Sequence, residues 1–134
     1  MLDRRSFILA TAATALVAPA SAQAQTLDYT PGLVDQRLAA GETVFLDFAA
    51  DWCSTCRRQE RVIDELRAAN PAYNSAITFV RVDWDQHGSG DLSQRLAVPR
   101  RSTLIVLRGD QELGRIVAGT SRSDIEALLN AGLA

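Results

Sequence analysis

The pattern of apolar and polar positions divides much of the chain into alternating strands and helices. Short apolar runs at residues 44–50, 77–83 and 103–107 are rich in branched and aromatic side chains and predict buried strands. A fourth strand is expected at 113–117, joined to the third by the turn at 108–111 as an antiparallel hairpin. These runs predict one sheet with a buried centre.

Helical spacing of apolar residues fills the intervals between the predicted strands. The longest predicted helix covers residues 53–69 and ends before Asn70-Pro71, because a residue that precedes proline disfavours the helical region. Since this helix crosses between the first two strands, those strands should be parallel. A polar loop is expected at 86–90. Shorter helices are predicted at 31–40, 91–96 and 122–130. The alternation indicates an α/β fold with helices on a central sheet.

The first residues have the pattern of a targeting segment. Arg4-Arg5 precede an apolar stretch at residues 7–17, and Ala20-Ser21-Ala22 form a small-x-small cleavage pattern. Eleven apolar residues are too few for a membrane span, which needs about twenty. We expect a cleavable export signal at 1–22, of the twin-arginine or the general secretory type, with cleavage after Ala24 as the alternative. The remaining 23–134 should form a single domain located in the periplasm.

Composition and charge limit the partners of this domain. The 134-residue chain is 47% hydrophobic and 22% charged, which is typical of a soluble globular domain. Its net charge of −2 argues against binding to nucleic acid or to an anionic membrane surface. We also expect no stable membrane insertion once the signal is removed.

The two cysteines of the chain, Cys53 and Cys56, lie where the first predicted strand passes into the long helix. Unpaired N–H groups and the helix dipole at a helix start stabilise an anion, so the pKa of Cys53 should be lowered. Cys56 lies nearly one turn further along the same side and can close a ring onto Cys53. This spacing suits dithiol exchange, with Cys53 as an exposed nucleophile and Cys56 as the resolving thiol.

Other uses of the pair fit the sequence less well. A zinc site needs about four ligands, whereas the chain has no second cysteine pair and only one histidine, His87. A structural disulfide that closes so small a loop would contribute only about 2 kcal/mol. The alternative that stays open is a binding module without turnover, whose dithiol holds a thiophilic metal such as copper or docks on a partner. For the favoured function in dithiol exchange, no metal-ligating residues are predicted.

The segment Asp47-Phe48-Ala49-Ala50-Asp51-Trp52-Cys53-Ser54-Thr55-Cys56 resembles the active-site segment of thioredoxins. Its Ala-Asp-Trp-Cys-x-x-Cys motif is most similar to that of the thioredoxin-like domain of bacterial transmembrane thiol:disulfide interchange reductases. The resemblance covers about the last hundred residues. It implies a thioredoxin fold, with a mixed sheet of four or five strands and helices on both faces.

The same resemblance implies a function. It indicates a periplasmic thiol:disulfide oxidoreductase that acts as a reductant on disulfide-containing client proteins. No dissociable cofactor is required, and a membrane electron-donor protein should supply the electrons. Ser54-Thr55 replaces the Gly-Pro of typical thioredoxins, which should change the reduction potential.

Three residues near the pair are assigned roles by this resemblance. Asp47 lies on a strand that should be buried, where burial raises a carboxyl pKa, and it is expected to take the proton of Cys56. The alternative for Asp47 is an acid at a strand edge that reaches water. Trp52 should shape the substrate-binding surface, or else only pack. Arg81 falls where thioredoxins often place a lysine near the buried acid, but a solvent-facing arginine is favoured.

The chain departs from the family at a proline. Thioredoxins place a cis-proline just before the third strand, beside the cysteines, and the alignment puts Ser102 at this position. Since a non-proline cis bond costs about 2.5–4 kcal/mol, the Arg101–Ser102 bond should be trans. The Ser102 hydroxyl should then lie near the sulfurs, in the substrate groove. A shifted loop that uses Pro99 as the cis-proline is the alternative.

Overall fold

The computed structural model describes residues 13–14 and 25–134. The predicted export signal at 1–22 falls almost entirely outside the described residues, and it stays a prediction. The described part of the chain forms a five-stranded sheet in the order β1-β3-β2-β4-β5. The strands are β1 (Thr26–Asp28), β2 (Thr43–Ala49), β3 (Ile77–Asp83), β4 (Thr103–Arg108) and β5 (Gln111–Val117).

The sheet is mixed. β1 and β2 each pair with β3 in parallel, whereas β4 is antiparallel to β2 and β5 is antiparallel to β4. The predicted parallel pairing across the long helix and the predicted β4–β5 hairpin are therefore confirmed. The expectation of a mixed sheet with four or five strands is also confirmed.

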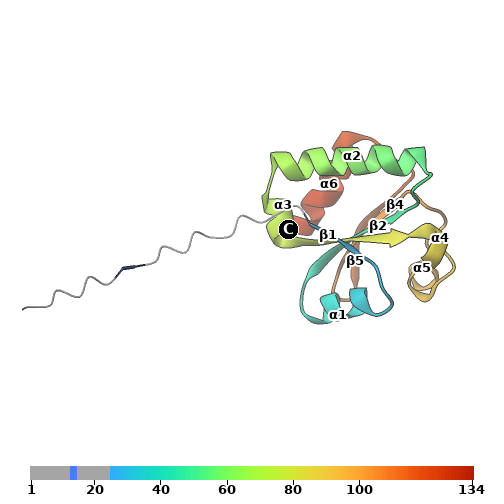
Figure 1. Cartoon of the computed structure of the whole chain (residues 1–134), viewed down its shortest axis with the longest axis horizontal. Helices are drawn as coiled ribbons and strands as arrows, with labels where there is room; N and C mark the ends of the chain where they lie inside the picture. Colours follow the sequence, from blue (N-terminus) through green and yellow to red (C-terminus); the bar gives the residue numbers. More distant parts are fainter. Residues whose placement is uncertain (1–12, 15–24) are drawn as a thin grey trace, which may run out of the picture.

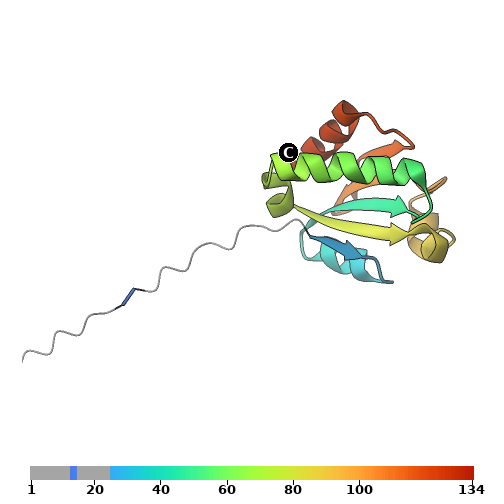
Figure 2. The same cartoon turned by 45° about the horizontal axis from the view of Figure 1, so that its top comes forward.

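Helices cover both faces of this sheet (Figures 1 and 2). One apolar core joins a sheet face to α2, α3 and α6, and a second core joins the opposite face to α1, α4 and α5. The helices are α1 (Leu33–Ala39), α2 (Ser54–Ala69), α3 (Ala72–Ala76), α4 (Trp84–His87), α5 (Asp91–Arg95) and α6 (Arg122–Leu133).

The central strand β2 determines where the cysteine pair lies. All seven of its residues are buried, because β3 and β4 flank it and helices cover both of its faces. Side chains alternate along a strand, so Phe45 packs in the α2 core while Leu46 and Phe48 pack in the opposite core. Asp47 follows the same alternation as Phe45 and lies on the α2 face.

Three elements were not predicted from the pattern: β1, α3 and α4. The loop expected at 86–90 is wrong at Gln86 and His87, which belong to α4. The side chain of Asp83 caps this helix by accepting a hydrogen bond from the backbone N–H of Gln86 (3.2 Å). In the part of the chain that the structure describes, no helix is long and apolar enough to cross a membrane.

Candidate active site around Cys53 and Cys56

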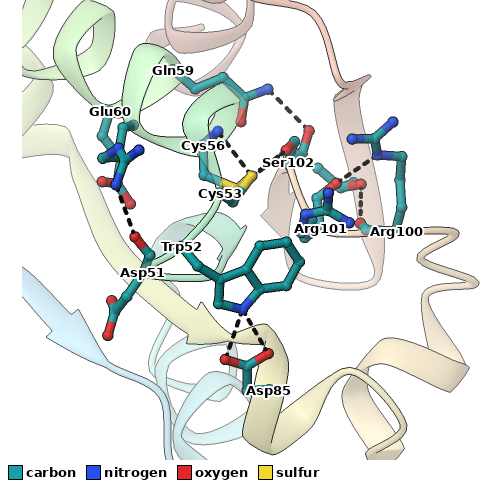
Figure 3. Close-up of a disulfide and its surroundings, with 12 residues drawn as sticks. Asp51, Trp52, Cys53, Cys56, Gln59, Glu60, Asp85, Arg100, Arg101 and Ser102 are labelled. Carbon is teal, nitrogen blue, oxygen red and sulfur yellow. Dashed lines mark hydrogen bonds between the residues drawn. A yellow bond between two sulfur atoms is a disulfide. The ribbon is translucent and has the colours of Figure 1, made fainter.

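The cysteine pair lies at the start of α2 and forms a disulfide, with the two Cα atoms 5.3 Å apart (Figure 3). Cys53 is the N-cap residue of the helix, and its Sγ accepts a hydrogen bond from the backbone N–H of Cys56 (3.2 Å). The sulfur of Cys53 therefore occupies the place at a helix N-terminus where an anion is stabilised. The predicted pairing of the two cysteines is confirmed.

The expectation of an exposed Cys53 is wrong. Cys53 is 3% exposed and Cys56 is fully buried, and both pack against Ala49 and Ala50. The backbone N–H of Cys53 donates to the carbonyl of Ala50 (3.1 Å), which folds the residue back against the end of β2. Of the two cysteines, Cys53 is only slightly the less buried.

Ser102 lies directly against the disulfide. Its Oγ is 3.2 Å from the Sγ of Cys53 and 3.1 Å from the Sγ of Cys56 (Figure 3). The described residues contain no cis peptide bond, which confirms the trans Arg101–Ser102 bond and excludes a cis bond at Pro99. The predicted proximity of the hydroxyl to the sulfurs is also confirmed. The role of Ser102 in substrate binding stays a prediction, because its fully buried side chain reaches the sulfurs and not the surface.

Gln59 is a residue of the site that was not predicted from the sequence. Its side chain is fully buried, and its Nε2 donates to the backbone carbonyls of Ser102 (3.0 Å) and Gly119 (2.9 Å). It thereby ties α2 to the segment before β4 and to the segment after β5. The spacing could have identified it, because Gln59 follows Cys56 by three residues and precedes the buried Ile63 by four.

Trp52 lies on the surface beside the disulfide and is 56% exposed. Its indole N–H donates to both carboxylate oxygens of Asp85 (3.0 and 3.1 Å), and the guanidinium of Arg101 lies 4.3 Å from the centre of one of its rings. Figure 3 shows the indole between these two residues, close to the sulfurs. The indole is more than half exposed, and the two contacts fix its orientation.

Asp47 is a buried carboxyl group on the strand that leads into the motif. It is 7% exposed, and its Oδ1 has no hydrogen-bond partner among the described residues. It lines a cavity of about 170 Å³ beneath α2, together with Glu60 and Asp64. Burial, and next the neighbouring Glu60, hold the pKa of Asp47 well above its ordinary value. Asp47 is therefore a buried carboxyl group in surroundings that favour its protonated form.

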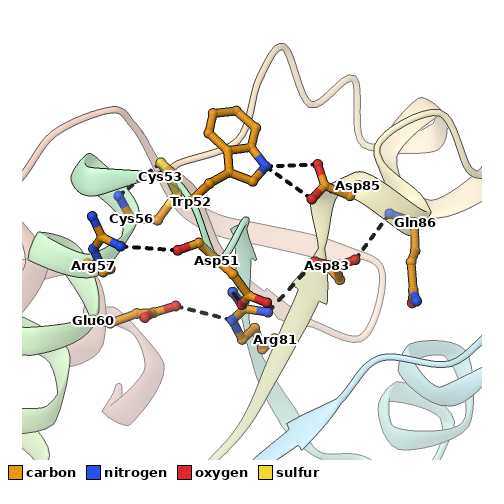
Figure 4. Close-up of polar contacts among 10 residues, drawn as sticks. All are labelled: Asp51, Trp52, Cys53, Cys56, Arg57, Glu60, Arg81, Asp83, Asp85 and Gln86. Atoms are coloured by element: carbon orange, nitrogen blue, oxygen red, sulfur yellow. Dashed lines mark hydrogen bonds and ion pairs between the residues drawn. A yellow bond between two sulfur atoms is a disulfide. The ribbon is translucent and has the colours of Figure 1, made fainter.

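Arg81 lies opposite Asp47 on β3 but binds other acids. Its guanidinium contacts the carboxylates of Asp51 (3.0 Å) and Glu60 (3.2 Å), as Figure 4 shows. The favoured expectation of a solvent-facing Arg81 is wrong, since its side chain is only 24% exposed and is held by these ion pairs. It links β3 to the loop before Cys53 and to α2.

The described residues contain no group of three or more His, Cys, Asp and Glu side chains placed to hold a metal ion. The one histidine, His87, packs edge-on against the ring of Tyr29, with 4.8 Å between the ring centres.

Comparison with known proteins identifies relatives of this arrangement. A protein-family model described as Thioredoxin matches residues 26–131. The chain is 30% identical over 87 residues to Thioredoxin H2-1 of Oryza sativa, which covers 65% of the chain and 58% of that protein. It is 26% identical over 113 residues to Thioredoxin 1 of Nostoc sp., covering 84% of the chain and 99% of that protein. The chain thus spans less than two thirds of the rice relative and nearly all of the Nostoc relative.

Solved structures give the same result for the fold. The structure of Trxlp from Edwardsiella tarda has a TM-score of 0.67 and 31% identity, covering 78% of this chain and 98% of that chain. The thioredoxin Mala s 13 of Malassezia sympodialis has a TM-score of 0.65, covering 84% of this chain and 96% of that chain. Its 18% identity supports the fold alone.

Proposed function

The chain belongs to the thioredoxin family, whose members are thiol:disulfide oxidoreductases, and we propose that it reduces disulfides of client proteins in the periplasm. The observation that carries this proposal is the Cys53–Cys56 disulfide at the N-terminus of α2, with the Cys53 sulfur as the cap. This geometry stabilises the thiolate of Cys53, which is the nucleophile in disulfide exchange.

The reaction begins with the reduced pair. The Cys53 thiolate attacks one sulfur of a client disulfide, so that a Cys53–client bond forms and the other client sulfur leaves as a thiolate. Cys56 then loses its proton, for which Asp47 is the proposed acceptor, and attacks the Sγ of Cys53. The Cys53–Cys56 disulfide forms and the second client sulfur leaves. The client gains two electrons, and the pair gives them up.

Direction and location are supported by the sequence. The Ala50-Asp51-Trp52-Cys53 wording resembles reductase domains, which favours the reducing direction. The arginine pair and apolar stretch at the start of the chain favour export to the periplasm. An exported reductant must be returned to its dithiol form, and we propose a membrane electron-donor protein as the source of those electrons.

Reduction of insulin, with dithiothreitol as the electron source, tests the activity. We expect the full chain, expressed in a bacterium and purified, to accelerate insulin reduction and the Cys53→Ser variant to give only the background rate. Equal rates for the two proteins would refute the proposal. A metal bound in stoichiometric amount after chelation, with no turnover, would identify the chain as a metal-holding module.

Two further measurements test the direction and the location. A reduction potential near about −270 mV supports a reductant, whereas one near about −120 mV contradicts it. Cell fractionation and the mass of the purified protein should show a periplasmic chain that begins after Ala22 or Ala24. A full-length chain recovered from the cytoplasm would refute export.

A further inference from the structure

The hydroxyl group of Ser102 contacts both sulfurs of the cysteine pair. Its Oγ lies 3.2 Å from one sulfur and 3.1 Å from the other, and either partner can be the donor in each contact. In the part of the chain that the structure describes, the only other hydrogen bond to either sulfur comes from the backbone N–H of Cys56. Ser102 is therefore the one described side chain placed to act on both sulfurs.

The backbone of Ser102 is held on several sides, which fixes the position from which its hydroxyl reaches the sulfurs. Its N–H donates to the carbonyl of Phe48 (2.7 Å), and its own carbonyl accepts from the N–H of Ala118 (2.8 Å) and from Gln59 Nε2 (3.0 Å). Its φ of 63° lies in the left-handed region, which a serine rarely adopts without such support. The residue is fully buried, so water has little access to compete for the hydroxyl.

A serine hydroxyl donates one hydrogen bond and accepts others, and the reduced pair can use both capacities. When the disulfide is reduced and Cys53 is ionised, one proton remains on Cys56. The Cys56 S–H can then donate to Ser102 Oγ, while the Ser102 O–H donates to the Cys53 thiolate. The thiolate would thus accept two hydrogen bonds, one from Ser102 and one from the backbone N–H of Cys56.

We propose that Ser102 is a catalytic residue whose hydroxyl stabilises the Cys53 thiolate and makes the pair easier to reduce. This proposal rests on the disulfide-exchange function proposed above. It assigns to a buried serine, at the position where the family has its cis-proline, a direct influence on both the reactivity and the redox balance of the dithiol.

Removing the hydroxyl should change two properties together. A hydrogen bond to a charged group is strong enough to change an equilibrium by about tenfold. At a pH below the thiol pKa, the thiolate fraction of Cys53 should therefore fall about tenfold in a variant that lacks the hydroxyl. The equilibrium with glutathione should shift about tenfold toward the disulfide, a decrease of about 30 mV in reduction potential.

Two substitutions separate the effect of losing the hydroxyl from the effect of straining the backbone at position 102. Both Ser102→Ala and Ser102→Gly remove the hydroxyl, but only glycine adopts a positive φ without strain. Ser93→Ala is the control, because Ser93 is also buried but donates to the carbonyl of His87 and contacts neither sulfur. Near-ultraviolet circular dichroism of the oxidised proteins checks that each variant folds. If alanine disturbs the fold, the glycine variant still tests the proposal.

The readouts are the thiolate absorbance of the reduced protein against pH and the equilibrium with glutathione. We expect both hydroxyl-free variants to shift in the same direction, and Ser93→Ala to match the wild type. The proposal is overturned if the folded glycine variant stays within about twofold of wild type in both measurements, or if the alanine and glycine variants shift in opposite directions. Neither readout needs client turnover. If the wild-type protein does not reduce insulin, the proposed function is therefore refuted, even if the Ser102 variants show the expected shifts in thiolate absorbance and glutathione equilibrium.

Discussion

Asp47 and Arg81 lie opposite each other on β2 and β3, yet in the described structure the guanidinium of Arg81 binds Asp51 and Glu60 and makes no hydrogen bond to Asp47. The buried acid is therefore left without a direct cationic partner. Its environment favours the protonated form, because burial and Glu60 both raise its pKa.

This arrangement predicts that Asp47 makes the folded protein less stable as the pH rises. The pKa of Asp47 is higher in the folded than in the unfolded state, so the folded state binds more protons between the two values. Stability should fall across that window, by about 1.4 kcal/mol for each unit that separates the two pKa values. Asp47→Asn should remove this loss and be more stable than wild type above the window.

Urea unfolding of the oxidised proteins from about pH 4 to about pH 8 measures the effect. The exposed Glu126 on α6 provides a control, and Glu126→Gln should follow the wild-type profile. A parallel profile for Asp47→Asn and wild type would show that the carboxyl does not titrate differently on folding.

Asp47→Asn should also slow the release of the client. The amide cannot accept a proton, so Cys56 would lose the proposed base for its attack on Cys53. A general base typically contributes about 100-fold or more, and the rate at which the mixed disulfide resolves should fall by about that factor. Rapid-mixing kinetics with a disulfide peptide should show normal formation and slow decay of the mixed disulfide. Unchanged decay would remove Asp47 from the mechanism.

Asp85→Ala should weaken the binding of protein clients without affecting the fold. Asp85 holds the indole N–H of Trp52, and losing it frees the largest exposed apolar side chain beside the disulfide. We expect KM for insulin to rise severalfold, with little change for a small disulfide reagent. The free energy of unfolding should change by less than about 1 kcal/mol, because the contact is exposed. The control Asp110→Ala, at the exposed β4–β5 turn, should change neither KM for insulin nor the free energy of unfolding. If Asp85→Ala and wild type have equal KM values for insulin, Trp52 does not need its contact with Asp85.

Gln59→Leu should destabilise the protein through the segment that carries Ser102. The substitution leaves the carbonyls of Ser102 and Gly119 without their hydrogen bonds from Nε2, which should cost about 1–3 kcal/mol. Gln94→Leu is the matched control, because its Nε2 donates to the Ser89 carbonyl at an exposed site. Urea unfolding should show a clear loss for the first variant and little for the second. If both variants lose a similar free energy of unfolding, the buried amide of Gln59 does not contribute specifically to stability.

The sequence predicted β2, β3 and β4 well because each is a short run rich in branched and aromatic side chains and bounded by polar residues. The pattern does not reveal β1, which has only three residues. It does not reveal α3 either, because Pro71 signals the end of α2 and also directly precedes a new helix. It missed α4 because Trp84–His87 is mostly polar, and the capping by Asp83 that begins this helix is a side-chain contact.

In the site, too, some residues can be placed from their spacing in the sequence, whereas others are placed only by tertiary contacts. The positions of Cys53, Cys56 and Asp47 follow from one strand and one helix, so local pattern was sufficient to place them. The burial of Gln59 is indicated in the sequence only by its spacing from Cys56 and Ile63, because the residues around it are mostly charged. The positive φ of Ser102 could not be foreseen, since it depends on partners in β2, α2 and the segment after β5.

The position of β2 at the centre of the sheet determines how the protein should lose its activity when it is heated. Its backbone amides are enclosed by neighbours on both edges, so their hydrogen exchange should require opening of the whole sheet. The cysteine pair follows shortly after this strand, which we expect to exchange most slowly. Loss of activity on warming should therefore coincide with melting of the entire domain and should not precede it.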